Sequence, residues 1–273
     1  MVINMNNQNK IPKKKHIVRN ILLIIAGLII LLVCIIVFQA NRNVRQMEIC
    51  ASEAISQISS ENELHQVDCS EFSNFKIYGF MNFDTEQYEI EDLGNLCMIR
   101  ANGGVMQMLT MVITPAKKDL PLISVDYMYM LGNRTAYIEI YDLNTGESEI
   151  RDAAIERMIS INSRYSSLAD TVPTPAWYDS VRTTGSFKKV TSKEDAELLE
   201  MLKDYLTEYL KAESETELLT ENMIPIKIDA MESYTHRLIS EGGVSTDVFM
   251  KNFGKEKTEK FFDTVMFGTE NYR

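Results

Sequence analysis

The fold is best recognised from Leu122-Ile-Ser-Val-Asp-Tyr-Met-Tyr-Met130, where residue character alternates from one position to the next. A period of two is typical of a β-strand, because successive side chains of a strand point to opposite faces of its sheet. The segment therefore predicts a strand with a carboxylate near its middle. Its two faces would carry Ser124, Asp126, Met128 and Met130 on one side, and Val125, Tyr127 and Tyr129 on the other.

Five similar runs lie close to this strand along the chain. Each is short and rich in β-branched, aromatic or other apolar residues, and glycine–asparagine turns separate several of them. Six strands with no helix between them predict an antiparallel meander. The five runs are residues 75–80, 87–91, 96–100, 105–113 and 135–141.

After residue 149 the apolar residues recur at helical spacing. Ser192-Lys-Glu-Asp195 resembles a capping box and opens a clear amphipathic pattern. Strands followed by helices predict an α+β fold, in which helices pack on an antiparallel sheet. The predicted helices cover residues 150–168, 192–210, 228–239 and 248–266.

Residues 21–38 form an uncharged run of Ile, Leu, Val and Phe broken only by Ala26, Gly27 and Cys34. A helix of this length is about 27 Å long, close to the hydrocarbon thickness of a bilayer. A buried core helix would keep a polar stripe, and a cleaved signal peptide would be followed by a small-x-small site; neither is present. We therefore predict a retained transmembrane signal anchor at 21–38. Around it we expect a basic cytoplasmic N-terminus at 1–20, a helical juxtamembrane segment at 39–70 and a domain at 71–273.

The distribution of charge predicts the orientation of this anchor. All five basic residues of the first 40 precede the apolar run, whereas only Arg42 and Arg45 follow it closely. The positive-inside rule then places the N-terminus in the cytoplasm and the domain outside it. Beyond residue 40, the sequence contains 23 Lys and Arg and 39 Asp and Glu, which gives a net charge of −16. Such an acidic domain is not expected to bind nucleic acid.

Several enzyme classes are disfavoured because their motifs are missing. The sequence contains no phosphate-binding glycine loop, no nucleophile elbow and no H-E-x-x-H zinc motif. Its histidines are His16, His65 and His236, too few for a histidine-rich metal site, so we predict no bound metal.

Asp126 is the most informative single residue. A buried, ionised and unpaired carboxylate costs several kcal/mol, so proteins pair it, raise its pKa or leave its face wet. A raised pKa would make Asp126 a proton donor near neutral pH. The alternatives are an ordinary ion pair with Arg100 or Arg134, or a solvated face.

Three segments together resemble the ferredoxin-dependent bilin reductase family. They are Pro121-Leu-Ile-Ser-Val-Asp126, Tyr137-Ile-Glu-Ile-Tyr-Asp-Leu143, and a tail in which Thr246-Asp-Val-Phe-Met-Lys-Asn-Phe-Gly254 precedes Phe261-Phe-Asp-Thr-Val-Met-Phe-Gly268. The similarity runs from about residue 75 to 268 and depends on order and spacing more than on any single motif. It implies a three-layer α/β/α sandwich with a central antiparallel sheet.

The resemblance also implies a chemistry. Members of the family reduce linear tetrapyrroles without a flavin or a metal, taking single electrons from ferredoxin and protons from side chains around the bilin. Asp126 matches the aspartate that protonates the pigment. Two other positions depart from the pattern: Thr110 stands where some members have a proton-donating histidine, and Gly242-Gly243 stands where many carry Asn-Asp. Asp247 lies four residues later and does not replace that pair cleanly.

The remaining predicted ligand contacts are Thr110, Met128, Trp177, Arg182 and His236. Trp177 and Arg182 lie where the family has a tryptophan-containing segment near the ligand, and the arginine could pair with a propionate. The alternatives are a packed tryptophan, a surface arginine and a surface histidine. A basic cluster near the C-terminus could dock an acidic electron carrier or form a solvated helix face; it comprises Lys251, Lys255, Lys257 and Lys260.

We therefore expect a membrane-anchored domain that binds a linear tetrapyrrole and has proton-coupled reduction as its chemistry. The expected partners are the membrane, the tetrapyrrole and an external one-electron donor such as ferredoxin, with no bound cofactor. The alternative is a non-catalytic ligand-binding, sensory or interaction domain outside the cell on the same fold. The predicted orientation favours this alternative, because ferredoxin is cytoplasmic.

Overall fold

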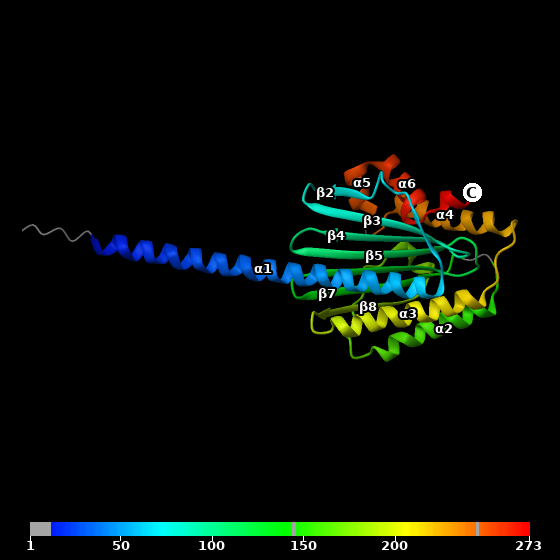
Figure 1. The fold of residues 1–273 in the computed structure, drawn as a ribbon, viewed down its shortest axis with the longest axis horizontal. Coiled ribbons are helices and arrows are strands. Elements are labelled where there is room, and N and C mark those ends of the chain that lie inside the picture. Colours follow the sequence, from blue (N-terminus) through cyan, green and yellow to red (C-terminus); the bar gives the residue numbers. More distant parts are fainter. Residues whose placement is uncertain (1–11, 144–145, 244–245) are drawn as a thin grey trace, which may run out of the picture.

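The computed structural model describes residues 12–143, 146–243 and 246–273, and its centre is an eight-stranded antiparallel sheet (Figure 1). The strand order is β1-β3-β4-β5-β6-β7-β8. The strand β2 pairs with the same edge of β3 as β1, but at the opposite end of β3. The six predicted strands correspond to β2–β7, although β2 ends at Ile77 and β3 begins at Met81, before the predicted strand at 87–91. The strands are β1 (Leu64–Val67), β2 (Asn74–Ile77), β3 (Met81–Ile90), β4 (Gly94–Asn102), β5 (Met106–Pro115), β6 (Leu122–Met130), β7 (Asn133–Tyr141) and β8 (Arg182–Thr191).

Helices cover both faces of this sheet, each over its own hydrophobic core. One face packs against α1, α2 and α3, while the other packs against α4, α5, α6 and the C-terminal turns. The predicted three-layer α/β/α sandwich is therefore confirmed. The helices are α1 (Pro12–Glu61), α2 (Glu149–Arg164), η1 (Trp177–Ser180), α3 (Asp195–Glu215), α4 (Met223–Glu241), α5 (Thr246–Phe253), α6 (Lys255–Phe261), the π-turn η2 (Phe262–Met266) and η3 (Thr269–Tyr272).

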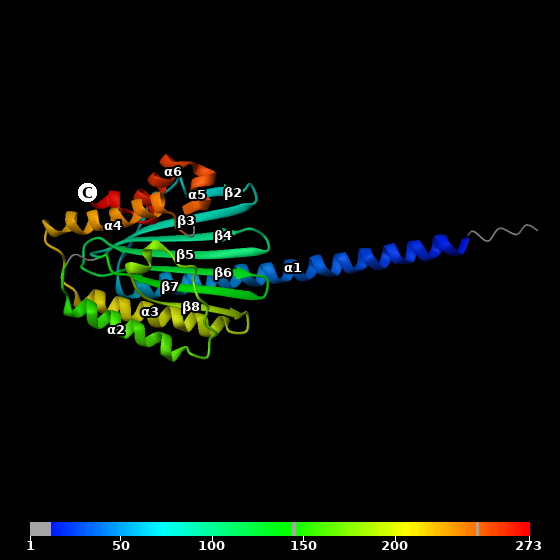
Figure 2. The same ribbon diagram turned by 180° about the vertical axis from the view of Figure 1, so that it is seen from behind.

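The helix α1 is both the apolar span and part of the domain core. It runs for 50 residues without a break, crossing in front of the sheet in Figure 1 and behind it in Figure 2. Its apolar stretch is exposed, whereas its C-terminal half buries five apolar side chains against the sheet and α3. The chain before Pro12, and with it most of the predicted basic N-terminus, lies outside the described residues. The five buried apolar residues are Met47, Cys50, Ala51, Ala54 and Ile58.

This arrangement corrects the predicted juxtamembrane segment. The helix ends at Glu61, and residues 64–67 form β1 instead of continuing it. Residues 39–70 are therefore helical only in their first two thirds. Because α1 supplies core side chains, the domain begins inside the helix and not at residue 71.

Several elements differ from those predicted. The strands β1 and β8 were not expected, and the helix predicted at 248–266 is divided at Gly254, whose φ of 77° is unfavourable inside an α-helix. The predicted capping box is wrong. The helix α3 begins after Glu194, whose carboxylate accepts hydrogen bonds from Thr191, and Asp195 is paired with Arg134 across 2.6 Å.

The two faces of β6 are as predicted. Val125, Tyr127 and Tyr129 are buried toward α1 and α3, and the Tyr127 hydroxyl donates to the Leu198 carbonyl at 3.0 Å. Asp126 consequently faces the opposite layer, between the sheet and α4. The strand alternation alone thus directs the carboxylate away from the α1 core.

Two buried amides hold the C-terminal turn over the second face. The Gln87 side chain donates to the Thr264 carbonyl at 2.8 Å, and the Asn95 side chain donates to the Val265 carbonyl at 3.1 Å. Gly268 follows with a φ of 65°, and a Cβ there would lie 2.4 Å from the Asn95 side chain. These contacts fix the position of Phe262 and Met266, which line the cavity described next.

Candidate functional site

A small cavity of about 70 Å³ lies between the sheet and the α4 layer. Strands β5, β6 and β7 form its floor, and α4 with the C-terminal turns forms its roof. Asp126 contributes the carboxylate at its centre. The other lining residues are Val112, Leu122, Ser124, Glu139, Tyr141, Tyr178, Tyr234, Leu238, Gly243, Thr246, Phe262, Met266 and Phe267.

Two hydroxyl groups hold the Asp126 carboxylate in place. Thr110 lies directly opposite it in the β5–β6 register and donates a hydrogen bond of 2.5 Å, while Ser124 lies 3.3 Å away on the same strand. Burial raises the pKa of Asp126 above its usual 3.8, and these two hydrogen bonds offset part of the rise. Asp126 is therefore predisposed to carry a proton.

The ion-pair alternative for Asp126 is wrong. Arg134 binds Asp195, and Arg100 lies 3.1 Å from each of Glu48 and Glu86. Both arginines occupy the sheet face that packs against α1 and α3, because their neighbours in register belong to that core. The sheet itself separates them from Asp126.

Glu139 is a second carboxylate of the cavity, which the sequence analysis missed. It lies on β7 beside Ser124 in the register and forms an ion pair with Arg182, whose guanidinium is 2.9 Å from the carboxylate. Burial raises its pKa, the nearby Asp126 charge raises it further, and Arg182 opposes both effects. The alternation of Tyr137-Ile-Glu-Ile-Tyr141 places Glu139 on the Asp126 face, so the sequence contained a signal for it.

Aromatic side chains form one wall of the site. The Tyr141 ring lies 5.2 Å from Tyr234 and 6.1 Å from Tyr178, and Trp177 lies 5.7 Å from Tyr234, measured between centroids. Burial raises the pKa of each of the three tyrosines, so their hydroxyls remain protonated. The wall offers flat apolar surfaces and neutral hydrogen-bond donors to a conjugated ligand.

A wider depression of about 380 Å³ adjoins the cavity and shares Tyr178 and Gly243 with it. Trp177 lines it, donates its indole N–H to the Gly242 carbonyl at 2.8 Å and supports the Arg237 guanidinium 4.1 Å above its ring. Gly242, Gly243 and Asp247 also line the depression. The structure thus places Trp177, a predicted ligand contact, beside Gly242-Gly243, the pair that differs from the family pattern. Both line the same depression.

The other predicted ligand contacts are less directly placed. Arg182 pairs with Glu139 and, at 2.8 Å, with Asp179, so its charge is already balanced. Met128 follows Asp126 on the same strand face but is absent from the cavity lining. His236 is more than half exposed on α4 and lies 3.4 Å from Asp263, also outside the cavity lining.

The basic cluster is partly neutralised. Lys260 pairs with Glu71 at 2.6 Å, Lys255 lies 3.5 Å from Glu259, and Lys257 lies over the Phe72 ring. All of these pairs are on the surface, where ion pairs contribute little stability. The cluster therefore offers less free positive charge to an acidic carrier than its sequence suggests.

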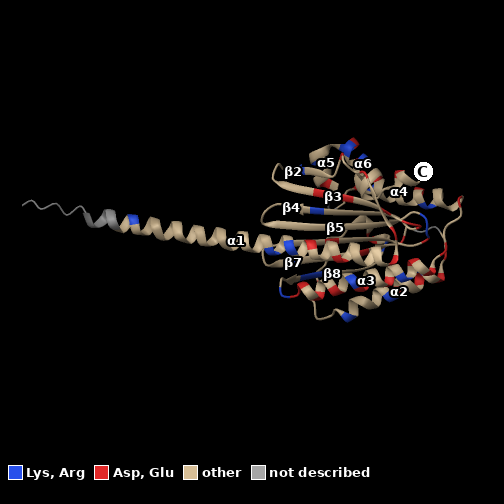
Figure 3. Cartoon of the chain, viewed as in Figure 1, with Lys and Arg blue, Asp and Glu red and all other residues tan. Residues whose placement is uncertain are grey.

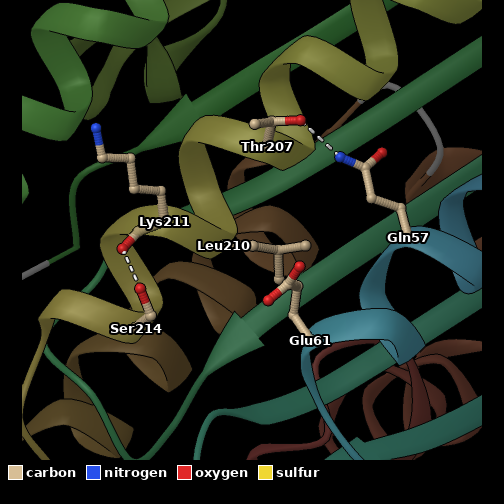
Figure 4. Close-up of a pocket in the computed structure, with 6 residues that line it drawn as sticks. All are labelled: Gln57, Glu61, Thr207, Leu210, Lys211 and Ser214. Carbon is tan, nitrogen blue, oxygen red and sulfur yellow. Dashed lines mark hydrogen bonds between the residues drawn. The ribbon is translucent and has the colours of Figure 1, made fainter.

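Two other features lie away from this site. A groove between α1 and α3, lined by Gln57, Glu61, Thr207, Leu210, Lys211 and Ser214, is on the opposite side of the sheet (Figure 4). There the Gln57 amide donates to the Thr207 hydroxyl at 2.8 Å, which clamps the two helices together. Glu63, His65 and Glu91 also converge, but all three are exposed near the outer edge of the sheet.

Comparison with known proteins identifies the family. A model of the ferredoxin-dependent bilin reductases matches residues 52–268, most of the chain. The chain belongs to the ferredoxin-dependent bilin reductase family. A search of curated proteins found no match. Among solved structures, phytochromobilin synthase from tomato, crystallised with biliverdin, superposes with a TM-score of 0.68 at 14% identity, covering 82% of this chain and 83% of that one.

As a bilin reductase family member, the chain has the fold expected from the sequence resemblance. The match begins at residue 52, inside α1, which agrees with the burial of this part of the helix in the domain core. Family membership supports bilin binding and reduction, with ferredoxin as the electron donor, at the level of the family.

Proposed function

We propose that this protein binds a linear tetrapyrrole between the sheet and α4 and reduces it by proton-coupled electron transfer. The observation that carries the proposal is Asp126, a half-buried carboxyl with a raised pKa at the centre of a cavity lined by aromatic residues. Reducing one double bond of a bilin requires two electrons and two protons. Asp126 supplies one proton to the pigment, the solvent supplies the other, and an external one-electron carrier supplies the two electrons one at a time.

The bilin occupies both the cavity and the adjoining depression. Pockets for ligands of this size hold roughly 300–1,000 Å³, more than the cavity alone provides. Tyr178 and Gly243 belong to both hollows, so displacement of the Tyr178 side chain joins them. The planar pigment then stacks against the aromatic wall with Asp126 near its conjugated system.

Biliverdin titration tests the binding site. We expect the full chain to change the biliverdin absorption spectrum stoichiometrically, and Ser124→Phe to abolish the change because its ring fills the cavity beside Asp126. Ser214→Phe is the matched control, since Ser214 is exposed in the groove of Figure 4. Equal spectra for the wild type and Ser124→Phe would refute the proposed location.

The apolar half of α1 supports a membrane anchor. Among the described residues, one helix is long and apolar enough to cross a membrane, and its apolar residues are exposed. We propose that α1 spans the bilayer once, with the N-terminus in the cytoplasm and the domain on the other side. The electron donor in that arrangement is a one-electron carrier on the side where the domain lies.

Labelling of an added cysteine tests this orientation. Glu91→Cys places a thiol in the exposed β3–β4 turn, and a membrane-impermeant maleimide should label it in intact cells. The parent chain is the control for its native cysteines, and lysed cells show the full extent of labelling. Labelling only after lysis would place the domain in the cytoplasm, where ferredoxin is available.

A further inference from the structure

Three hairpin turns at one end of the sheet expose apolar side chains. They join β2 to β3, β4 to β5 and β6 to β7. Residues 77–83, 101–113 and 127–133, which contain these turns, include no Asp, Glu, Lys or Arg. The exposed fractions range from 39% for Leu131 to 61% for Phe80. We call these residues the apolar tips: Tyr78, Phe80, Val105, Met130 and Leu131.

The opposite end of the sheet is charged. The β3–β4 turn contains Glu91 and Asp92, and the β5–β6 connection contains Lys117, Lys118 and Asp119. Figure 3 shows this contrast: the three turns at the end nearest the apolar half of α1 are tan, and blue and red residues lie at the far end. The apolar tips are therefore a property of one end only.

That end is the one from which α1 extends toward its apolar stretch (Figure 1). The Arg42 guanidinium donates to the Ser192 carbonyl at 2.8 Å, and the Ser192 N–H donates to the Gly132 carbonyl at 2.9 Å in the β6–β7 turn. These two bonds set the β6–β7 turn, which carries Met130 and Leu131, level with residue 42 of α1. The apolar run ends at Phe38, only about 6 Å away along the helix.

The tips also keep bulky residues in a backbone conformation that they rarely adopt. Tyr78 has a φ of 53° and Leu131 a φ of 52°, a region that favours glycine and asparagine. The Leu131 N–H donates to the Val105 carbonyl at 3.3 Å, which joins two of the turns. Strain of this kind persists at positions where a side chain serves a purpose other than folding.

Cations lie on one side of the apolar tips, next to the β6–β7 turn. Arg42 and Arg45 are exposed on α1, and Lys193 is near them in the β8–α3 loop. Cations beside tyrosine and aliphatic side chains are typical of the interface between water and lipid headgroups.

We propose that the apolar tips insert into the headgroup layer of the bilayer that α1 spans, so that the domain stands directly on the membrane. This inference rests on the proposed anchoring of α1. The partner is a phospholipid surface. Its contact with the tips would shield apolar area that the hairpin turns otherwise expose to water.

Depth-dependent fluorescence quenching tests the contact. The full chain, with Cys34→Ala and Cys69→Ser, is given one new cysteine, labelled with an environment-sensitive dye and reconstituted in phosphatidylcholine–phosphatidylglycerol vesicles. Val105→Cys reports on the tips, and Glu91→Cys is the control at the far end. We expect a nitroxide in the headgroup region to quench the Val105→Cys dye about twofold or more beyond the Glu91→Cys dye.

A double variant separates lipid contact from folding. Tyr78→Asn with Leu131→Asn suits the left-handed backbone, so the melting temperature should not fall, while quenching at Val105→Cys should decrease. Equal quenching at both ends overturns the proposal, as does shielding of Val105→Cys that depends on protein density and would indicate a second copy. Release of the chain by alkaline carbonate would refute the anchor as well, whereas a retained chain with water-exposed tips refutes only the docking.

Discussion

Asp126→Asn should slow bilin reduction by about 10²–10⁴-fold while leaving bilin binding nearly unchanged. Asparagine keeps the shape of the side chain and still accepts the hydrogen bond that Thr110 donates at 2.5 Å. It removes only the titratable proton. Single-turnover reduction of bound biliverdin with an excess of reduced ferredoxin, alongside a binding titration, measures both effects.

The same substitution should not destabilise the domain at neutral pH. Burial raises the pKa of Asp126, so the folded state binds more protons than the unfolded state above the usual pKa of 3.8. The stability of the wild type consequently falls as the pH rises through the raised pKa, and the variant lacks this loss. The two proteins should converge below the usual pKa and diverge above it, with Asp126→Asn the more stable. Asp126→Asn also removes the charge that raises the pKa of Glu139, and this smaller effect likewise favours the stability of the variant.

Asp84→Asn is the matched control, because Asp84 is an exposed mid-strand aspartate on β3. It should change neither the rate nor the pH profile of the melting temperature. A loss of stability in Asp126→Asn with an unaltered reduction rate would assign Asp126 a structural role and remove it from the chemistry.

Removal of all of α1 should abolish folding, whereas removal of only its apolar half should not. A chain beginning at Asn41 keeps the five buried apolar side chains of the helix, and one beginning at Asn62 loses them all. Met47 and Ile58 alone would contribute about 2–5 kcal/mol each by comparison with large-to-small substitutions, against a total stability of roughly 5–15 kcal/mol. We expect cooperative thermal unfolding for the first chain and an aggregating, molten product for the second.

Two point variants of the full chain check the same conclusion without truncation. Ile58→Ala should destabilise the domain by about 2–5 kcal/mol, and the exposed neighbour Ser59→Ala by less than about 0.5 kcal/mol. If the chain beginning at Asn62 melts as cooperatively as the longer one, α1 is a detachable tether and its packing on the sheet is dispensable.

The parts of the fold with strong periodicity could be predicted from sequence. Leu122–Met130 was predicted with its bounds and both faces as observed, because alternation determines which face each side chain takes. The strand β8 was missed because Arg182–Thr191 alternates weakly and carries lysines whose aliphatic stems are buried, as at Lys188. The anchor at 21–38 and the helical segment at 39–70 were predicted as separate units, because a helical pattern does not show where an exposed span becomes a buried one.

The candidate site was only partly predictable for a different reason. Asp126 stood out because a carboxylate interrupts an apolar strand face. Glu139 has the same signal, but only strand pairing shows that it lies beside Ser124 at the same cavity. The segment around Trp177 was located by resemblance, whereas its contact with Gly242 depends on a pairing 65 residues away that no local pattern encodes.

Because the C-terminal part of α1 belongs to the core, no flexible linker separates the domain from the apolar stretch of the helix. A flexible linker would let a tethered domain sweep a volume and sample many orientations, which determines how often it meets its partners. Here the helix passes from its apolar stretch into the core without a single non-helical residue, and Arg42 is already bonded to the domain. In the proposed membrane arrangement, the mouth of the pocket would be held at one height above the bilayer and at one angle to it. A pigment and an electron carrier would then have to approach along the directions that this fixed orientation permits.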